Sequence, residues 1–129
     1  MPFKFENLDV WKLSIEYSYS IYLITLKFPK AEIFNLTVQF KRAANSISLN
    51  ISEGSIGQSN KEQCRFINYS IRSLAECVNC LYLAIKLEYI SKLEFDELYK
   101  KSEILFSKLQ NFKKAIATQT PINKYVVRS

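Results

Sequence analysis

Glycine is nearly absent from this chain, and its scarcity limits the fold more than any other feature of the sequence. The 129 residues hold two glycines, Gly54 and Gly57, and three prolines. Proteins built from strands and tight turns need many such residues, because glycine and proline adopt the backbone angles of turns. Apolar residues at helical spacing fill the long stretches on both sides of the two glycines. The sequence therefore predicts an all-α protein.

Four helices are expected from this periodicity and from signals at the helix ends. They lie at about residues 8–27, 36–53, 59–88 and 92–117, and a tail follows at residues 118–129. Short connections make sequential helices pack antiparallel, so we predict an antiparallel up-down-up-down four-helix bundle. The length suits a single domain that spans residues 1–129.

Individual residues mark the expected helix ends. Pro29 ends the first helix, because proline disfavours helical backbone at the preceding residue. Asn35 is the expected N-cap of the second helix, and Gly54 is expected to end that helix at its C′ position. The segments Ser59–Glu62 and Ser91–Glu94 have the pattern of capping boxes that open the third and fourth helices.

The first helix has two apolar faces. We assign one face, with a 3–4 spacing, to the core: Leu8, Trp11, Ile15, Ser18, Tyr22 and Leu26. The opposite face carries Val10, Leu13, Tyr17, Ile21, Ile24 and Phe28. Because an exposed apolar patch of this size marks an interaction surface, this second face is predicted to be the interface of a homo-oligomer. The alternative is a central helix whose second face the tail or a loop covers.

The sequence contains no histidine, which removes the usual general base and the usual metal ligand. Cys77 and Cys80 form a C-x-x-C pair inside a helical run, whereas a redox pair normally opens a helix. We therefore expect them to be buried apolar side chains rather than a redox or metal site. No metal, cofactor or catalytic residue is expected, and the protein is predicted not to be an enzyme.

Two polar pairs interrupt the apolar pattern. Asn50 and Glu53 are three residues apart and share a helix face, and so do Ser73 and Glu76. We assign the four residues to a structural polar network that sets the register of the bundle. The alternative is a carboxylate site, in which case the protein would be an enzyme that uses Glu53 and Glu76.

Positive charge is concentrated at the end of the chain. Residues 1–99 hold 11 Lys and Arg against 11 Asp and Glu, whereas residues 100–129 hold seven basic residues against one acid. The seven are Lys100, Lys101, Lys108, Lys113, Lys114, Lys124 and Arg128. Cations at a helix C-terminus complement the macrodipole, but only within the last turn. We predict that these residues contact the phosphates of RNA or DNA, the alternative being a structural and solubilising role.

Membrane insertion is not expected from the sequence. No apolar run reaches the roughly 20 residues that cross a bilayer, and the first residues lack a signal-peptide core. A cytoplasmic location is the resulting expectation.

Several short segments, in a fixed order, match a known family. They are residues 5–11 (FENLDVW), Phe28-Pro29, residues 36–44 (LTVQFKRAA), Ser46-Ile47, residues 50–54 (NISEG) and residues 73–76 (SLAE). From about residue 3 to residue 116, the chain resembles the four helix bundle proteins described as 23S rRNA intervening-sequence proteins. Asn35 departs from the pattern, because the family commonly has glycine there.

This resemblance implies a left-handed four-helix bundle that assembles as a pentameric ring. It also implies a relationship to the accessory subunits of diversity-generating retroelements, basic bundles that associate with reverse transcriptase and nucleic acid. The family has no established catalytic activity. The leading expectation is a non-enzymatic oligomeric scaffold that binds RNA or DNA through lysines. The alternative is an adaptor that binds a protein, such as a polymerase, without contacting nucleic acid.

Overall fold

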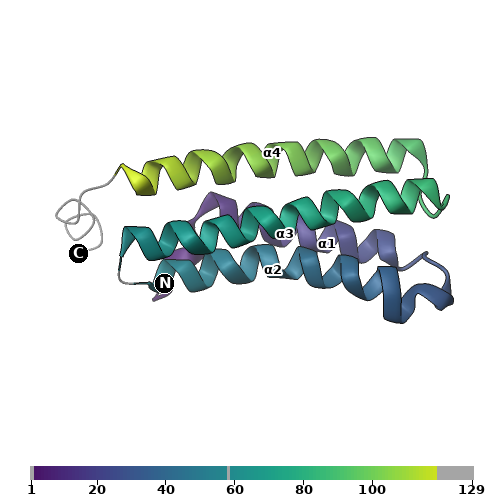
Figure 1. Cartoon of the computed structure of the whole chain (residues 1–129), viewed down its shortest axis with the longest axis horizontal. Coiled ribbons are helices and arrows are strands. Elements are labelled where there is room, and N and C mark those ends of the chain that lie inside the picture. The colour runs from purple at the N-terminus through teal and green to yellow at the C-terminus, as the bar shows by residue number, and fades with distance from the viewer. Residues whose placement is uncertain (1, 58, 119–129) are drawn as a thin grey trace.

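The computed structural model describes residues 2–57 and 59–118 of the chain. Over these residues the chain forms four long α-helices and no strand (Figure 1). The helices are α1 (Asp9–Thr25), α2 (Val38–Ile56), α3 (Asn60–Lys86) and α4 (Lys92–Ala117), and a 3-10 turn, η1 (Lys4–Asn7), precedes them. The predicted all-α class and four-helix fold are confirmed.

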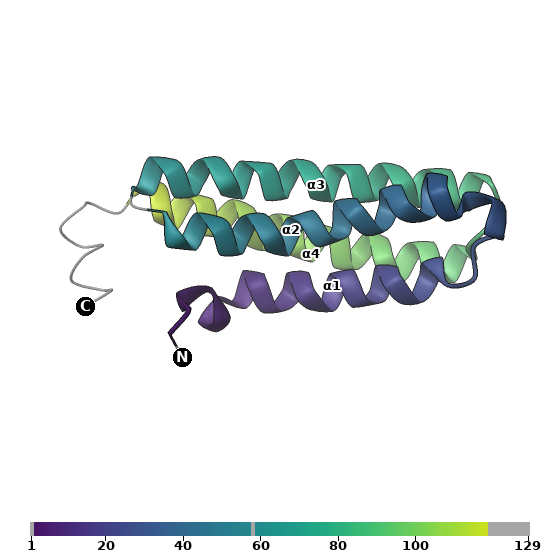
Figure 2. The ribbon, with the colours of Figure 1, turned by 90° about the horizontal axis from the view of Figure 1, so that it is seen from below.

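The helices pack in a ring around one core. Contacts join α1 to α2, α2 to α3 and α3 to α4, and sparser ones join α4 to α1. Figure 2 shows α1 and α3 on opposite sides of the bundle, and the colour order in Figure 1 shows successive helices running in opposite directions. All four helices contribute side chains to the fully buried core, which includes Ile21, Phe40, Ile47, Ile51, Ile67, Leu74, Leu81, Leu105 and Leu109.

The two faces of α1 are exchanged relative to the prediction. The face assigned to an oligomer interface lies in the core of the single chain: Val10, Tyr17, Ile21, Ile24 and Phe28 are buried, and Leu13 is half-buried. On the face assigned to the core, Ile15, Tyr22 and Leu26 are exposed. Both faces are apolar, so periodicity could not separate them. The buried face also contains Ser14, whose small side chain permits close packing and donates to the Trp11 carbonyl (2.6 Å).

The connection between α1 and α2 differs from the expected N-cap. It contains a 3-10 turn, η2 (Lys30–Glu32), and a π-helical turn, η3 (Ile33–Thr37). Glu32, and not Asn35, caps this segment, because its carboxylate accepts a hydrogen bond from the Leu36 N–H (3.3 Å). Asn35 lies inside the turn with φ −127° and ψ −106°, outside the helical region, and the preceding Phe34 is 94% exposed.

Gly54 does not end α2, which continues to Ile56. A Cβ atom on Gly54 would lie 2.8 Å from the Cβ atom of Phe66 on α3, so the glycine allows the two helices to approach closely. The Ser70 hydroxyl of α3 donates to the Ile47 carbonyl of α2 (2.8 Å), further along the same contact.

The connection between α3 and α4 uses a left-handed residue. Glu88 has φ 63°, and the Tyr89 N–H bonds to the Ala84 carbonyl (2.9 Å), which gives α3 the hydrogen-bond pattern of a Schellman end. The predicted capping box of Ser91 and Glu94 is complete at the start of α4. At the start of α3, Ser59 accepts from the Glu62 N–H (3.0 Å).

Candidate functional site

The lysines of α4 do not form a single stripe. Lys100, Lys101, Lys108 and Lys114 are exposed and Lys113 is half-buried. The Lys101 ammonium donates to the Ser20 hydroxyl of α1 (3.0 Å), and Lys108, seven residues later, lies on the same side of α4. The Lys113 carbonyl accepts a contact from the Cys64 thiol of α3 (3.8 Å). Lys124 and Arg128, also named from the sequence, lie outside the described residues.

The start of α3 adds basic residues that sequence reasoning missed. Lys61, Arg65 and Arg72 are exposed and, at intervals of four and seven residues, share one face of α3. The contact between Cys64 and Lys113 places the first turns of α3 beside the last turns of α4. We call Lys61, Arg65, Arg72, Lys113 and Lys114 the basic surface. The spacing of the basic residues on α3 could be seen in the sequence. That these residues lie beside the end of α4 could not.

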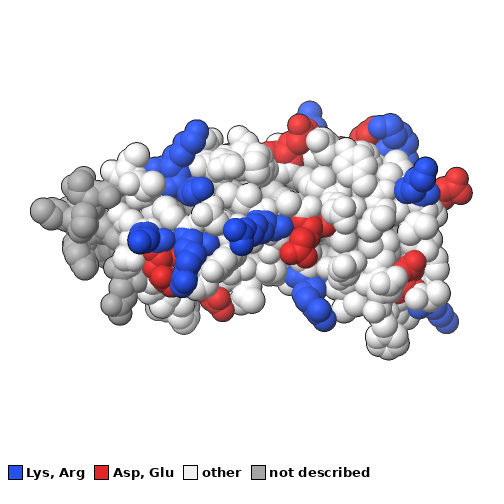
Figure 3. All heavy atoms as spheres, viewed as in Figure 1, with Lys and Arg blue, Asp and Glu red and all other residues white. Residues whose placement is uncertain are grey.

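Few acids lie among these cations. Residues 60–72 and 109–117 contain the five basic residues and one acid, Glu62. Glu62 pairs with Arg65 (2.5 Å), and both side chains are solvent-exposed, so the pair is a weak one. In Figure 3, Lys and Arg atoms (blue) predominate over Asp and Glu atoms (red) in the half of the bundle where α3 begins and α4 ends. The two signs are mixed over the other half.

Only part of the predicted polar network forms. The Asn50 amide donates to the carbonyl and to the hydroxyl of Ser46 (2.8 and 3.0 Å), and the Ser73 hydroxyl donates to the Ser46 hydroxyl (2.9 Å). Asn50 and Ser73 thus meet through Ser46, which links α2 to α3. Glu53 and Glu76 lie exposed at the surface, outside these hydrogen bonds.

A hollow of about 440 Å³ opens between the first half of α2 and the middle of α3. Small side chains leave this space, because Ala43, Ser46 and Ser73 stand where larger residues would fill it. The remaining lining is polar or lies towards η3: Phe34, Asn35, Val38, Gln39, Arg42 and Glu76. The hollow therefore offers a guanidinium, a carboxylate, two amides and an aromatic ring. All of its lining residues except Phe34 and Asn35 lie in segments that carry the family resemblance.

Cys77 and Cys80 are buried, as expected from their position within a helix. Burial raises the pKa of the Cys77 thiol well above its ordinary value and the pKa of the Cys80 thiol to about 11. Both thiols are therefore protonated at neutral pH, and such thiols are poor nucleophiles. Nearby, the Tyr17 hydroxyl bonds to the Ser102 hydroxyl (2.8 Å), which in turn donates to the Leu98 carbonyl (2.8 Å).

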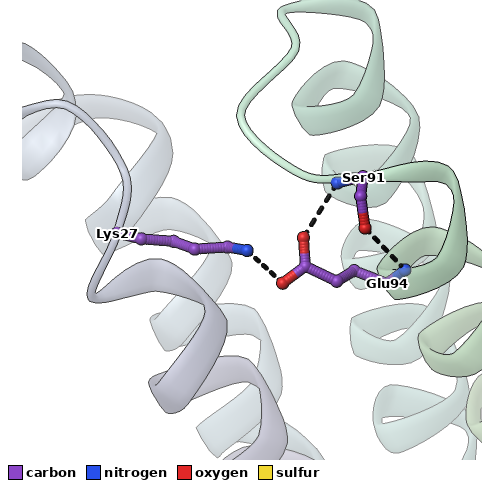
Figure 4. A network of polar contacts seen from close by, with 3 residues as sticks. All are labelled: Lys27, Ser91 and Glu94. Atoms are coloured by element: carbon purple, nitrogen blue, oxygen red, sulfur yellow. Dashed lines mark hydrogen bonds and ion pairs between the residues drawn. The ribbon is translucent and has the colours of Figure 1, made fainter.

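Two polar contacts join the loops at one end of the bundle. The Lys27 ammonium pairs with the carboxylate of Glu94, which also accepts from the Ser91 N–H (2.8 Å, Figure 4). Mainly through Lys27, these contacts lower the pKa of Glu94. The Tyr89 hydroxyl donates to Glu32 (2.6 Å), and this hydrogen bond lowers the pKa of Glu32. These structural contacts join the α1–α2 connection to the first turn of α4 and to the α3–α4 connection.

The outer side of α1 carries an apolar surface. Ile15, Tyr19, Tyr22, Leu23 and Leu26 are exposed, and we call these five residues the α1 face. Their spacing places most of them along one stripe of the helix. Lys41 of α2 lies over the Tyr22 ring, 5.2 Å from its centroid. This surface has the composition of an interaction site.

Neither a cluster of metal-binding side chains nor a membrane-spanning helix is found among the described residues. Among them, no group of three or more His, Cys, Asp or Glu side chains is placed to hold a metal ion. None of the helices formed by residues 2–57 and 59–118 has the length and apolar character needed to span a membrane.

Comparison with known proteins assigns the family. The family model of the 23S rRNA-intervening sequence protein matches residues 6–111. The chain is also similar to the 1.70 Å crystal structure of a protein with unknown function from the S23 ribosomal protein family of Bacteroides thetaiotaomicron VPI-5482. The TM-score is 0.73 at 24% identity, over 81% of this chain and 98% of that one, and this likeness concerns the fold. No curated protein matches the chain. The chain thus belongs to the 23S rRNA-intervening sequence protein family.

Proposed function

We propose that the protein is a non-enzymatic helical scaffold that binds the phosphate backbone of RNA or DNA through its basic surface. The observation that carries the proposal is the juxtaposition of the start of α3 with the end of α4, which gathers Lys61, Arg65 and Arg72 beside Lys113 and Lys114. Clustered cations bind nucleic acid by neutralising phosphates and releasing counterions, largely without regard to base sequence. The uneven charge of the whole chain, a net +6, supports the same reading.

We further propose that several copies associate through the α1 face, as a pentamer by analogy with the family resemblance. Five large apolar side chains on α1 and its C-cap residue favour burial against another protein surface. An assembly multiplies the basic surface, and linked weak contacts then bind with greater avidity. The residues of the first helix that were predicted from the sequence to form the interface do not serve here, because they pack into the core of each chain.

Fluorescence anisotropy with labelled RNA and DNA tests the nucleic-acid proposal. We expect binding that weakens with salt, with a log–log slope of about −0.9 for each phosphate neutralised on a duplex. Replacing Lys61, Arg72 and Lys114 by glutamine should weaken binding and flatten the slope. A matched control replaces three exposed lysines outside the basic surface, Lys12, Lys30 and Lys86. It should change the affinity and the salt slope less. Equal effects of the two triple variants, or no binding at low salt, would contradict the proposal.

The second candidate function is a protein adaptor, and the observation that favours it is the same α1 face. If the purified chain is a monomer, this face is free to bind a different protein. The adaptor then needs no contact with nucleic acid, and the basic residues serve solubility.

A further inference from the structure

We infer that the hollow between α2 and α3 holds an unstacked nucleobase of a single strand. This inference rests on the proposed nucleic-acid function and adds to it a site that distinguishes single strands from duplexes. The hollow, of about 440 Å³, falls within the size range of small-ligand sites.

The side chains of the hollow match the chemistry of a base. Phe34 lies at its edge with 94% of its surface exposed, and an exposed aromatic ring is the usual platform for stacking a base. The Gln39 amide and the Glu76 carboxylate can donate to and accept from a base edge. The Asn35 amide donates one hydrogen bond to Glu32 (3.0 Å) and keeps its oxygen and its second N–H for a base. Arg42 supplies a cation for the attached phosphate.

The irregular backbone at Asn35 directly follows the exposed Phe34. A regular helix through residues 33–37 would continue the ordinary pattern of α2, whereas φ −127° and ψ −106° at Asn35 interrupt it. The Phe34 ring next to this interruption lies in solvent beside polar groups, where a planar ligand can stack on it.

The basic surface begins about one helical turn of α3 away from the hollow. Arg72 lies one helical turn from Glu76 on α3, and Arg65 and Lys61 follow along the same face. From Glu76 back to Lys61 is about 22 Å at 1.5 Å per residue, which roughly six stacked nucleotides span at 3.4 Å each. A single strand can therefore place one base in the hollow and run its phosphates along α3.

The test uses the full chain with Phe34 replaced by alanine or by tryptophan. We expect Phe34→Ala to weaken binding of single-stranded oligonucleotides about tenfold, to leave duplex binding unchanged, and to keep the salt slope. Phe34→Trp should retain single-strand binding. Equal losses for single strands and duplexes, or no loss for either, would overturn the inference while the proposed function stands.

Free mononucleotides separate the inference from the proposed function. In a chain that carries Phe34→Trp and Trp11→Phe, mononucleotides should quench the remaining tryptophan, and Arg42→Gln should weaken that quenching. Quenching without any polynucleotide binding would support base binding in the hollow and contradict phosphate binding by the basic surface. Absence of quenching by mononucleotides, or quenching by free amino acids instead, would overturn the inference, the latter in favour of a zwitterionic ligand held by Arg42 and Glu76.

Discussion

At the scale of single residues, two positions depend on backbone geometry rather than on side-chain chemistry. Gly54 stands where α2 and α3 approach closely, and the neighbouring atom is the Cβ of Phe66, which cannot move without its own backbone. Glu88 adopts φ 63°, a conformation in which any side chain with a Cβ atom is strained. Position 54 therefore requires glycine, and position 88 would favour glycine but holds a glutamate.

We expect Gly54→Ala to destabilise the fold by about 1–3 kcal/mol, although alanine is the better helix former. The added methyl group would lie 2.8 Å from the Phe66 Cβ and force α3 away from α2. Thermal unfolding measures the effect, with the exposed helical position Asn45→Ala as control. A melting temperature equal to or above that of the wild type would contradict the close approach.

We expect Glu88→Gly to stabilise the protein by about 1 kcal/mol, because glycine adopts positive φ without a Cβ clash. Glu88→Ala removes the same charge but keeps the clash, so it should give no comparable gain. Chemical denaturation of both variants separates the two causes, and equal stabilities would show that charge and not conformation matters.

At the scale of helices, the ends are held by polar contacts whose strength depends on pH. Glu94 completes the capping box of α4 and pairs with Lys27 of the α1–α2 connection (Figure 4). The carboxylate therefore serves one helix start and one contact between connections. Its pKa lies below the ordinary value of 4.5, so the folded state favours the charged form.

We expect Glu94→Gln to lower the melting temperature at neutral pH by an amount that shrinks on acidification. A carboxylate with a lowered folded pKa contributes stability above its unfolded pKa and loses it as pH falls through the folded pKa. The difference between wild type and variant should thus be full above about pH 4.5 and fade below it. Melting curves across this range measure it. A difference that stays constant with pH would assign the effect to packing.

At the scale of the whole molecule, the four helices leave two distinct surfaces exposed. The α1 face is apolar, and the basic surface combines α3 with α4. Because α1 and α3 lie on opposite sides of the bundle (Figure 2), association through α1 would leave the basic residues of α3 facing outward. A ring of copies could then present several basic surfaces to one nucleic acid.

We expect light scattering to give a mass well above the 15.1 kDa of one chain. Ile15→Glu with Leu26→Glu should reduce that mass to a monomer that remains helical, because a buried unpaired charge is costly at an interface. The control pair Leu93→Glu and Ile104→Glu changes two exposed apolar residues of α4 and should leave the assembly intact. A monomeric wild type would contradict self-association and favour the adaptor.

Much of the architecture could be read from local signals. The capping box at Ser91 and the helical periodicity of the residues that follow predicted α4, since caps and periodicity act between residues close in sequence. The burial of Cys77 and Cys80 followed from their place inside a helical run. The candidate sites were harder to predict from the sequence. Lys113 and Lys114 were found by composition, but their neighbours Lys61 and Arg65 are some fifty residues away in sequence.

The sequence by itself determined the helical class, the number of long helices and most of their ends, because these depend on interactions within a few residues. Only the tertiary structure decided which apolar face of α1 enters the core, since both faces satisfy the same periodicity. It also decided that Gly54 serves a contact with Phe66 rather than a helix end. Both outcomes depend on where one helix meets another, and such long-range contacts leave no signature in local spacing.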